Sequence, residues 1–191
     1  MPFVAKLKST GQRISIDDYE RPREQLASGD IICQFPDCGS DLFVKSGLII
    51  KPHFAHKPNS PCRTSLEAHP ESAEHRLGKR MVAQWLAENF KSKGYERVRI
   101  EYEVVVPEAG RVADVMVTFP GGMREAHEIQ LARISHHDIE RRTLSYLNAG
   151  ISAIWWIGES SDSDQPSNRE WLLRETGELL LLKIVVSDNI P

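Results

Sequence analysis

The stretch "RVADVMVTFPGGMREAHEIQLA", residues 111–132, contains two strand-like runs separated by a Pro-Gly-Gly turn. The first run is mainly apolar, and turn residues bound both runs, as is typical of β-strands. Asp114 lies inside the first run. Glu128 and Gln130 share one face of the second run, because side chains two residues apart along a strand point the same way. The stretch therefore predicts an antiparallel pair of strands that contains acidic and amide side chains.

A long helix is predicted before this pair, over residues 70–94. Pro70 precedes it, acidic residues fill its first turn, and Lys-Ser-Lys-Gly ends it. Leu77, Met81 and Trp85, with Val82 and Leu86 as further candidates, give an apolar stripe at helical spacing. Residues 96–107 then alternate as a strand should.

The segments after the pair predict a second helix and a buried strand. Residues 134–150 read as a helix closed by Gly150, and residues 151–158 read as a central strand with apolar residues on both faces. We expect strand or hairpin structure over residues 169–185. The predicted order from residue 70 is helix, three strands, helix, strand, which is an α/β (α+β) fold.

The composition is that of a soluble globular protein. The 191 residues carry a net charge of −3 and are 40% hydrophobic and 27% charged. Neither a membrane-length apolar run nor the apolar core of a signal peptide is found in the sequence, so we expect a cytoplasmic protein. The net charge argues against a nucleic-acid coat protein but not against a nucleic-acid enzyme. We expect residues 1–65 to form one module and residues 66–191 a second domain.

The carboxylates of the strand pair indicate metal chemistry. Asp114 is costly to bury in an apolar strand unless its charge is compensated. Antiparallel pairing across the Pro-Gly-Gly turn can bring Asp114 beside Glu128, and two such carboxylates repel unless a divalent cation lies between them. Oxygen ligands of this kind suit Mg²⁺ or Mn²⁺. The alternative is that Asp114 ends its strand near solvent and Glu128 is a surface residue.

All three cysteines, Cys33, Cys38 and Cys62, lie close together in the sequence, with His53 and His56 between them. An odd number of cysteines in a reducing compartment argues against disulfides, and structural zinc takes four such ligands in a tetrahedron. Residues 53–56 place the two histidines on opposite faces if they are extended. We therefore expect zinc on the three cysteines and one histidine, with the choice of histidine open. Buried thiols with surface imidazoles are the alternative.

Helical spacing also groups charged residues. Glu71, His75 and Lys79 lie one turn apart on the first helix, and Arg142 and Tyr146 do so on the second. Solvated faces with ordinary ion pairs are the alternative. A basic face that could contact phosphates is predicted around the first helix and the following strand. Its residues are Arg76, Lys79, Arg80, Lys91, Lys93, Arg97 and Arg99.

Five stretches in order resemble the CoiA-like competence protein family. They are "HFAH" (53–56), "ESAEH" (71–75) with Lys79, "RVADV" (111–115), "EIQ" (128–130) and "ISHHDIERRTLSYLNAGISAIWWIG" (134–158). The resemblance covers about residues 31–158. It implies a zinc-binding N-terminal module, resembling a zinc ribbon, joined to a nuclease domain of the PD-(D/E)xK, or restriction-endonuclease-like, fold with an αβββαβ core.

Residue by residue, the resemblance implies a catalytic site. Asp114 and Glu128 would hold Mg²⁺ or Mn²⁺, and Glu74 would be an additional acidic residue, with Glu71 as its alternative. Gln130 takes the place of the lysine found in many nucleases of this fold. Lys79 or Arg142 would then supply the missing cation.

These observations predict a metal-dependent DNA nuclease or DNA-processing protein. The resemblance also implies a role with incoming single-stranded DNA, in company with a recombinase. A non-catalytic DNA-binding or adaptor protein that keeps the fold is the alternative, favoured by Gln130. A pure interaction protein with a zinc knuckle is a third hypothesis, which has no need of the acidic groups.

Overall fold

The computed structural model describes residues 3–47, 51–58, 60, 62, 72–158 and 166–184. The chain forms two compact units, residues 1–73 and 74–191. The boundary expected between residues 65 and 66 lies outside the described residues. Each unit is described by itself.

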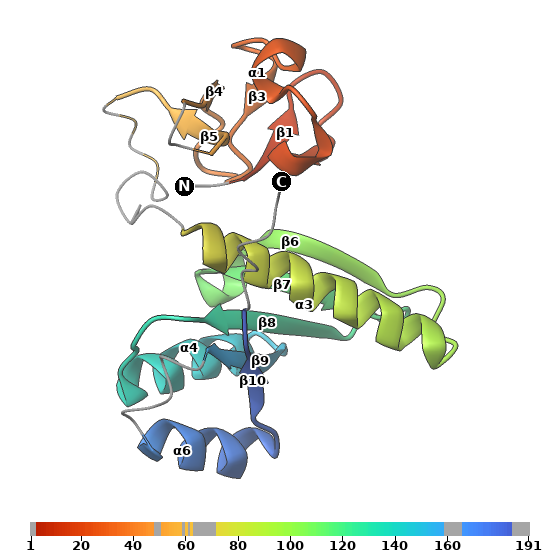
Figure 1. Cartoon of the computed structure of the whole chain (residues 1–191), viewed down its shortest axis with the longest axis vertical. Helices are drawn as coiled ribbons and strands as arrows, with labels where there is room; N and C mark the ends of the chain where they lie inside the picture. The colour runs from red at the N-terminus through yellow and green to blue at the C-terminus, as the bar shows by residue number, and fades with distance from the viewer. Residues whose placement is uncertain are drawn as a thin grey trace, which may run out of the picture. The chain divides into compact units, whose positions relative to one another are not determined.

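The first unit consists of short strands joined by turns, as the sequence predicts (Figure 1). One antiparallel sheet has the strand order β2-β1-β3, and β4 and β5 form a second, two-stranded sheet. The buried side chains of the first unit include Phe3, Ile16, Ile31, Leu42 and Phe54. The elements are β1 (Val4–Leu7), β2 (Arg13–Ser15), η1 (Ile16–Asp18), α1 (Pro22–Gln25), β3 (Ile31–Ile32), β4 (Leu42–Lys45) and β5 (His53–His56).

The second unit is built on a mixed sheet of five strands in the order β10-β9-β8-β7-β6. The pairs β6–β7 and β7–β8 are antiparallel, whereas β8–β9 and β9–β10 are parallel. The predicted order of helix, three strands, helix and strand is present. The elements are α3 (Ala73–Ser92), β6 (Arg99–Val106), η2 (Pro107–Ala109), β7 (Arg111–Thr118), β8 (Arg124–Gln130), α4 (His136–Asn148), β9 (Ser152–Gly158), α6 (Pro166–Thr176) and β10 (Leu180–Leu182).

Helices α3 and α4 pack on the sheet with separate apolar clusters (Figure 1). Val82, Ala83 and Leu86 of α3 pack against Val115 and Ile129. The cluster around α4 instead joins Tyr146 to Met116, Ala126 and Ala153. Ser135 caps the first turn of α4 by accepting a hydrogen bond from the Asp138 amide, and Gly150 follows its end with a φ of 69°. These two residues fix where α4 begins and ends.

The expected apolar stripe on the first helix was right for Val82 and Leu86, which are buried in the core, but wrong for Met81 and Trp85. Met81 and Trp85 are 38% and 49% exposed, while Gly78 and Lys79 are buried beside Val82. The helix turns this narrower face to the sheet because a glycine permits close approach. A Cβ on Gly78 would lie 3.2 Å from Ile129 Cγ2 and from Leu182 Cδ2. Leu77, Met81 and Trp85 lie on the flank of the buried face.

The expectation of strand or hairpin structure throughout residues 169–185 was also wrong. Residues up to Thr176 belong to α6, and among the described residues that follow, β10 is the strand. Among the helix residues whose burial is described, Asn168, Trp171 and Leu172 are buried, at helical spacing. Trp171 and Leu172 pack with Ile139 of α4 and so bury one face of a helix that the sequence pattern left ambiguous.

Candidate functional sites

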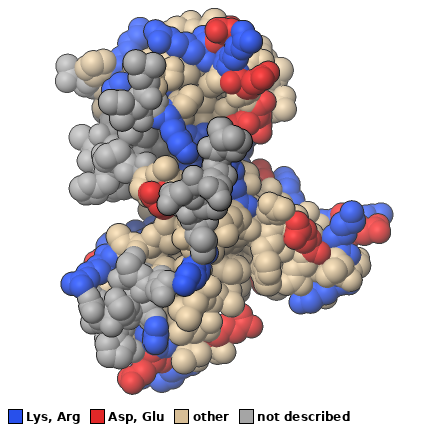
Figure 2. All heavy atoms as spheres, viewed as in Figure 1, with Lys and Arg blue, Asp and Glu red and all other residues tan. Residues whose placement is uncertain are grey.

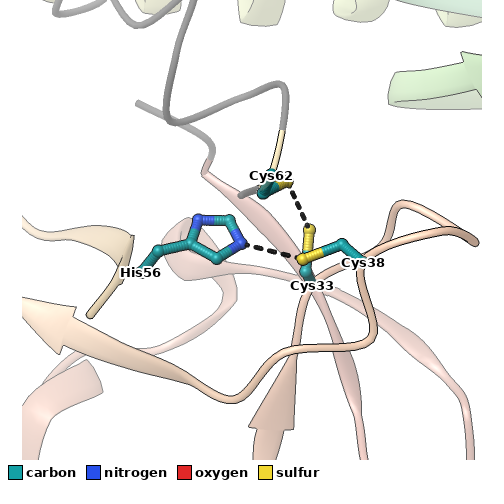
Figure 3. Close-up of side chains that lie close together, drawn as sticks. All are labelled: Cys33, Cys38, His56 and Cys62. Atoms are coloured by element: carbon teal, nitrogen blue, oxygen red, sulfur yellow. Dashed lines mark hydrogen bonds between the residues drawn. The ribbon is translucent and has the colours of Figure 1, made fainter. Parts of the chain in front are cut away.

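The first site is a cluster of Cys33, Cys38, His56 and Cys62 in the first unit (Figure 3). Cys33 directly follows β3, and Cys38 lies in the next turn, where its amide donates to the Phe35 carbonyl. His56 ends β5. The four ligand atoms all lie within 4.8 Å of one another. The segment after β3, the turn that holds Cys38, the end of β5 and Cys62 thus converge on one point.

The distances in the cluster fit a tetrahedral zinc ion. Zinc–sulfur bonds of about 2.3 Å put two tetrahedral thiolates about 3.8 Å apart, and a thiolate and an imidazole nitrogen about 3.6 Å apart. Cys33 Sγ and Cys62 Sγ are 3.7 Å apart, and Cys38 Sγ lies 3.4 Å from His56 Nε2. The cysteines are free, and burial raises the pKa of the Cys33 thiol to about 12. Crowded buried thiols of this kind are stabilised as thiolates by a cation.

The structure separates the two histidines that the sequence left open. Because β5 is extended, His53 and His56 face opposite ways, and His56 alone of the two belongs to the cluster. His53 Nδ1 lies 3.0 Å from the Lys51 carbonyl. Its Nε2 is buried and has no hydrogen-bond partner among the described residues. His53 therefore acts as a core residue of the first unit.

The second site is a row of three carboxylates across β6, β7 and β8. Glu103 occupies the register position opposite Asp114, between the pairs Tyr102–Val115 and Val104–Ala113. Asp114 is opposite Glu128, one step beyond the Val115–His127 pair. Side chains at opposed positions in neighbouring strands lie on the same face and close together. Asp114 and Glu128 therefore lie close together just beyond the last pair of the β7–β8 ladder, as the sequence predicted, and Glu103 lies on the other side of Asp114.

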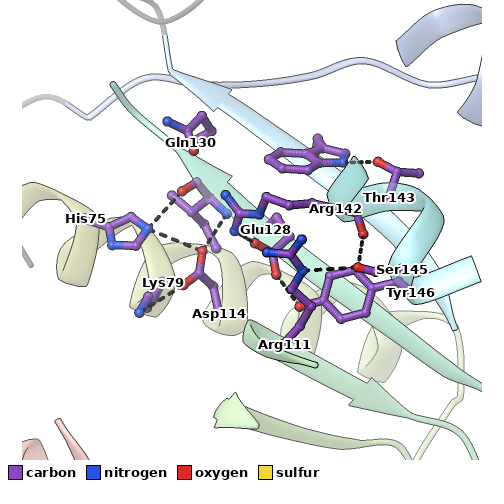
Figure 4. A network of polar contacts seen from close by, with 12 residues as sticks. His75, Lys79, Arg111, Asp114, Glu128, Gln130, Arg142, Thr143, Ser145 and Tyr146 are labelled. Carbon is purple, nitrogen blue, oxygen red and sulfur yellow. Dashed lines mark hydrogen bonds and ion pairs between the residues drawn. The ribbon is translucent and has the colours of Figure 1, made fainter. Parts of the chain in front are cut away.

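Asp114 is held by α3 and by the backbone of β8 (Figure 4). Its Oδ1 lies 3.0 Å from Lys79 Nζ. Its Oδ2 accepts a hydrogen bond of 2.9 Å from the Ile129 amide and lies 3.3 Å from His75 Nε2. His75 Nε2 also lies 2.8 Å from the Ile129 carbonyl. Asp114 and His75 thus satisfy the backbone of Ile129 where the β7–β8 ladder ends.

Glu128 is completely buried and is held by α4 (Figure 4). Tyr146 donates its hydroxyl to Oε1 at 2.7 Å, and the Arg142 guanidinium forms an ion pair with Oε2. The guanidinium of Arg142 also lies over the ring of Trp155, at 5.0 Å from its centroid. Arg142 and Tyr146, one helical turn apart, therefore both point to Glu128.

The two carboxylates differ in their acidity. Burial opposes the charge on Asp114, but Lys79 and then His75 hold the pKa of Asp114 well below its ordinary value. Burial raises the pKa of Glu128, and the charge of Asp114 adds to this, although Arg142 acts in the opposite direction. Neighbouring carboxyl groups whose pKa values are driven apart are typical of sites that move protons.

The arrangement does not fit a bound divalent cation as it stands. Asp114 and Glu128 supply the oxygen ligands that Mg²⁺ or Mn²⁺ prefers. Every one of their four carboxylate oxygens, however, already contacts a protein donor: Lys79, the Ile129 amide, Tyr146 or Arg142. Among the described residues, the cysteine–histidine cluster is the one place where three or more possible ligand atoms converge.

Two other residues of the predicted catalytic set lie apart from the carboxylates. Glu74 is exposed in the first turn of α3. Gln130 donates its amide to the Ala132 carbonyl at 2.7 Å, and Figure 4 shows it away from Asp114 and Glu128. Glu71, the alternative to Glu74, lies outside the described residues.

Glu103 is the residue of this site that the sequence did not indicate, whereas helical spacing had already grouped His75 with Lys79. Glu103 is buried, lies 3.3 Å from Lys79 Nζ and has a φ of 46°, the one positive φ among the described non-glycine residues. Its place in "EYEVVV" looks like an ordinary alternating strand. A buried Glu103 needs a cation as its partner, and Lys79 is that cation. The sequence did not reveal this pair, because a lysine on a helix is normally expected in solvent.

Two residues of the predicted basic face are engaged within the protein. Lys79 is buried in the carboxylate site, and Arg99 pairs with Glu101 at 2.8 Å. In the view of Figure 2, acidic and basic side chains alternate at the end of α3.

Within the described part of the chain, no helix is both long and apolar enough to cross a membrane.

The fold and the sites define a mixed α/β protein with a five-stranded sheet, a buried carboxylate site and a separate Cys₃His cluster. Residues 71–181 match the family model "Competence protein CoiA, nuclease-like domain", and residues 22–65 match "Competence protein CoiA, N-terminal domain". The chain belongs to the CoiA competence protein family, as the sequence motifs predicted.

A curated relative is similar over part of its length. "Competence protein CoiA" of Bacillus subtilis (strain 168) is 36% identical over 125 residues, which cover 65% of this chain and 31% of the relative. The matched region thus spans about a third of that protein. No solved structure matches the chain.

Proposed function

We propose that the protein is a DNA nuclease that cleaves phosphodiester bonds at the Asp114–Glu128 site. The observation that carries the proposal is a pair of adjacent carboxylates, Glu128 fully buried and Asp114 largely so, each held by a cation from a different helix, within a domain of the nuclease-like family. This is also the position that the PD-(D/E)xK fold gives to its acidic residues in the resemblance described above.

The roles of individual groups follow from their surroundings. Glu128, whose pKa is raised by burial, is the group best suited to accept or return a proton near neutral pH. Lys79 and Arg142 supply positive charge beside it, the kind of charge that stabilises a phosphate as negative charge develops. A dependence on Mg²⁺ or Mn²⁺ remains a prediction, because a divalent cation would have to displace Lys79 or Arg142 from the carboxylates.

A second candidate is a DNA-binding adaptor without catalysis. It is favoured because all four oxygens of Asp114 and Glu128 contact protein donors and because Gln130 is bound to the main chain. In that case the site serves folding, and the zinc-binding module and the second unit bind DNA or a partner such as a recombinase.

One experiment separates the two functions. The full chain is incubated with single- and double-stranded DNA, with Mg²⁺, Mn²⁺ or a chelator, alongside Glu128→Gln and Glu125→Gln. Glu125 is the matched control, because it lies on the same strand outside the carboxylate row. Cleavage lost in Glu128→Gln and kept in Glu125→Gln supports the nuclease.

Two other results change the conclusion. Cleavage that continues in chelator supports the nuclease but contradicts the Mg²⁺ or Mn²⁺ dependence. Failure of the wild-type protein to cleave under every condition, while it still binds DNA, overturns the nuclease in favour of the adaptor.

A further inference from the structure

Arg111 is a half-buried cation that the roles described above leave without a function. It is the first residue of β7, and its Nε donates to Ser145 Oγ at 3.1 Å. Among the described residues, no carboxylate lies within ion-pair distance of its guanidinium. A partly buried arginine without a carboxylate partner is unusual, because removing a charge from water is costly.

The surroundings of Arg111 are positively charged. Burial lowers its pKa, and the charges of Arg142 and Arg141 lower it further, with Tyr146 and Glu128 acting in the opposite direction. Glu128 is already paired with Arg142, and Asp138 with Arg141 at 2.9 Å. Of the three arginines Arg111, Arg141 and Arg142, Arg111 is therefore the one without a carboxylate partner among the described residues.

Ser145 fixes the direction of the Arg111 side chain. Its hydroxyl donates to the Arg142 carbonyl at 2.7 Å, so its oxygen is oriented to accept from Arg111 Nε. With Nε held in this way, the two terminal nitrogens of Arg111 form no hydrogen bond within the described structure. Figure 4 shows this guanidinium near Glu128, on the side of Ser145 and Tyr146. The donors of a guanidinium form a planar fork that matches two oxygens of a phosphate.

We propose that Arg111, with Arg141 beside it, binds a backbone phosphate of DNA next to Glu128. Ser145 is a positioning residue that orients Arg111. The proposal rests on the proposed function for its choice of DNA, and it adds the residues that hold the strand at the carboxylate site. The bound phosphate supplies the negative charge that Arg111 lacks in the protein alone.

The test measures DNA binding without cleavage. Fluorescence anisotropy with a short labelled single-stranded DNA, in chelator and over a series of salt concentrations, is compared for the wild type, Arg111→Met, Arg141→Met and Arg97→Met. Arg97 is the matched control, because it is exposed beyond the end of α3. Arg141 is 56% exposed, so its replacement leaves the fold intact even if Arg111→Met unfolds the protein. Tryptophan fluorescence checks folding.

Removal of one phosphate contact should weaken binding about tenfold. It should also reduce the slope of log affinity against log salt by about 0.7. We expect both changes for Arg111→Met and for Arg141→Met, and neither for Arg97→Met. Affinities within about twofold of the control for both variants, or a wild type that does not bind DNA, would overturn the proposal. DNA that binds through Arg111 but is never cleaved leaves this inference standing and removes only the nuclease.

Discussion

Replacement of Lys79 by methionine should strongly destabilise the second unit. Methionine keeps most of the side-chain length but removes a buried ammonium that lies 3.0 Å from Asp114 and 3.3 Å from Glu103. At an effective dielectric constant of 20, each of these contacts corresponds to about 5 kcal/mol of gross Coulomb attraction, which the desolvation of the three groups largely offsets. Loss of one partner from a buried pair costs about 3–5 kcal/mol, and we expect a loss of that size at neutral pH.

Urea unfolding followed by tryptophan fluorescence measures this loss. The protein's four tryptophans, at positions 85, 155, 156 and 171, all lie in the second unit, so the signal reports on that unit alone. Lys91→Met is the matched control: Lys91 is exposed in the last turn of the same helix, and its replacement should change the free energy of unfolding by no more than about 0.5 kcal/mol.

Acidic pH should reduce the effect of the Lys79 substitution. Without the ammonium, burial at Asp114 is no longer offset by Lys79, so the pKa of Asp114 rises and this carboxyl can be protonated at mildly acidic pH. The loss in Lys79→Met should therefore shrink as the pH falls towards 5, and adding Glu103→Gln should recover part of it. A loss below about 1 kcal/mol at neutral pH, or one that is independent of pH, would refute the reasoning.

Three further outcomes are expected. We expect one zinc ion on the purified wild-type chain; His56→Ala should lose it and His53→Ala should retain it, and equal loss from both would contradict the geometry of the cluster. Gly158→Ala should lower the free energy of unfolding by about 1–3 kcal/mol, because its Cβ would lie 3.0 Å from the Leu131 Cα, and a neutral result would be inconsistent with that contact. The lowered pKa of Asp114 should stabilise the second unit above its ordinary pKa of 3.8 and lose that contribution as the pH falls below it. Urea midpoints of Asp114→Asn should therefore depend less on pH in this range than those of the wild type, and parallel pH profiles would contradict this.

The sequence predicts the central part of the sheet well because its local signals agree. The two strand-like runs and the Pro-Gly-Gly turn between them predict the antiparallel pairing of β7 and β8, which places Asp114 and Glu128 just beyond the Val115–His127 pair. Ser135 and Gly150 likewise mark the ends of α4. The extended form of β5 also explains why only one of its two histidines can join the cysteines, as the alternation of side chains predicts.

The helix faces could not be predicted in the same way. An apolar stripe indicates which side chains can be buried, but the sheet beneath α3 decides which side chains are buried. Close approach at Gly78 and the attraction of Asp114 for Lys79 turn a glycine and a lysine inward, and leave Trp85 on the flank. The role of Glu103 depends on a backbone conformation that no pattern of residue types reveals.

The carboxylate row also limits how the strands can align during folding. A slip of one residue in β8 would move Glu128 off the face of the sheet that Arg142 and Tyr146 contact. The unpaired carboxylate of Glu128 would then lie against the apolar side chains packed under α3. Strands rich in valine tolerate many alignments, since one valine resembles the next. The buried ionic row removes that tolerance, so the same groups that we propose for chemistry also select a single strand alignment from several that hydrophobic packing alone would accept.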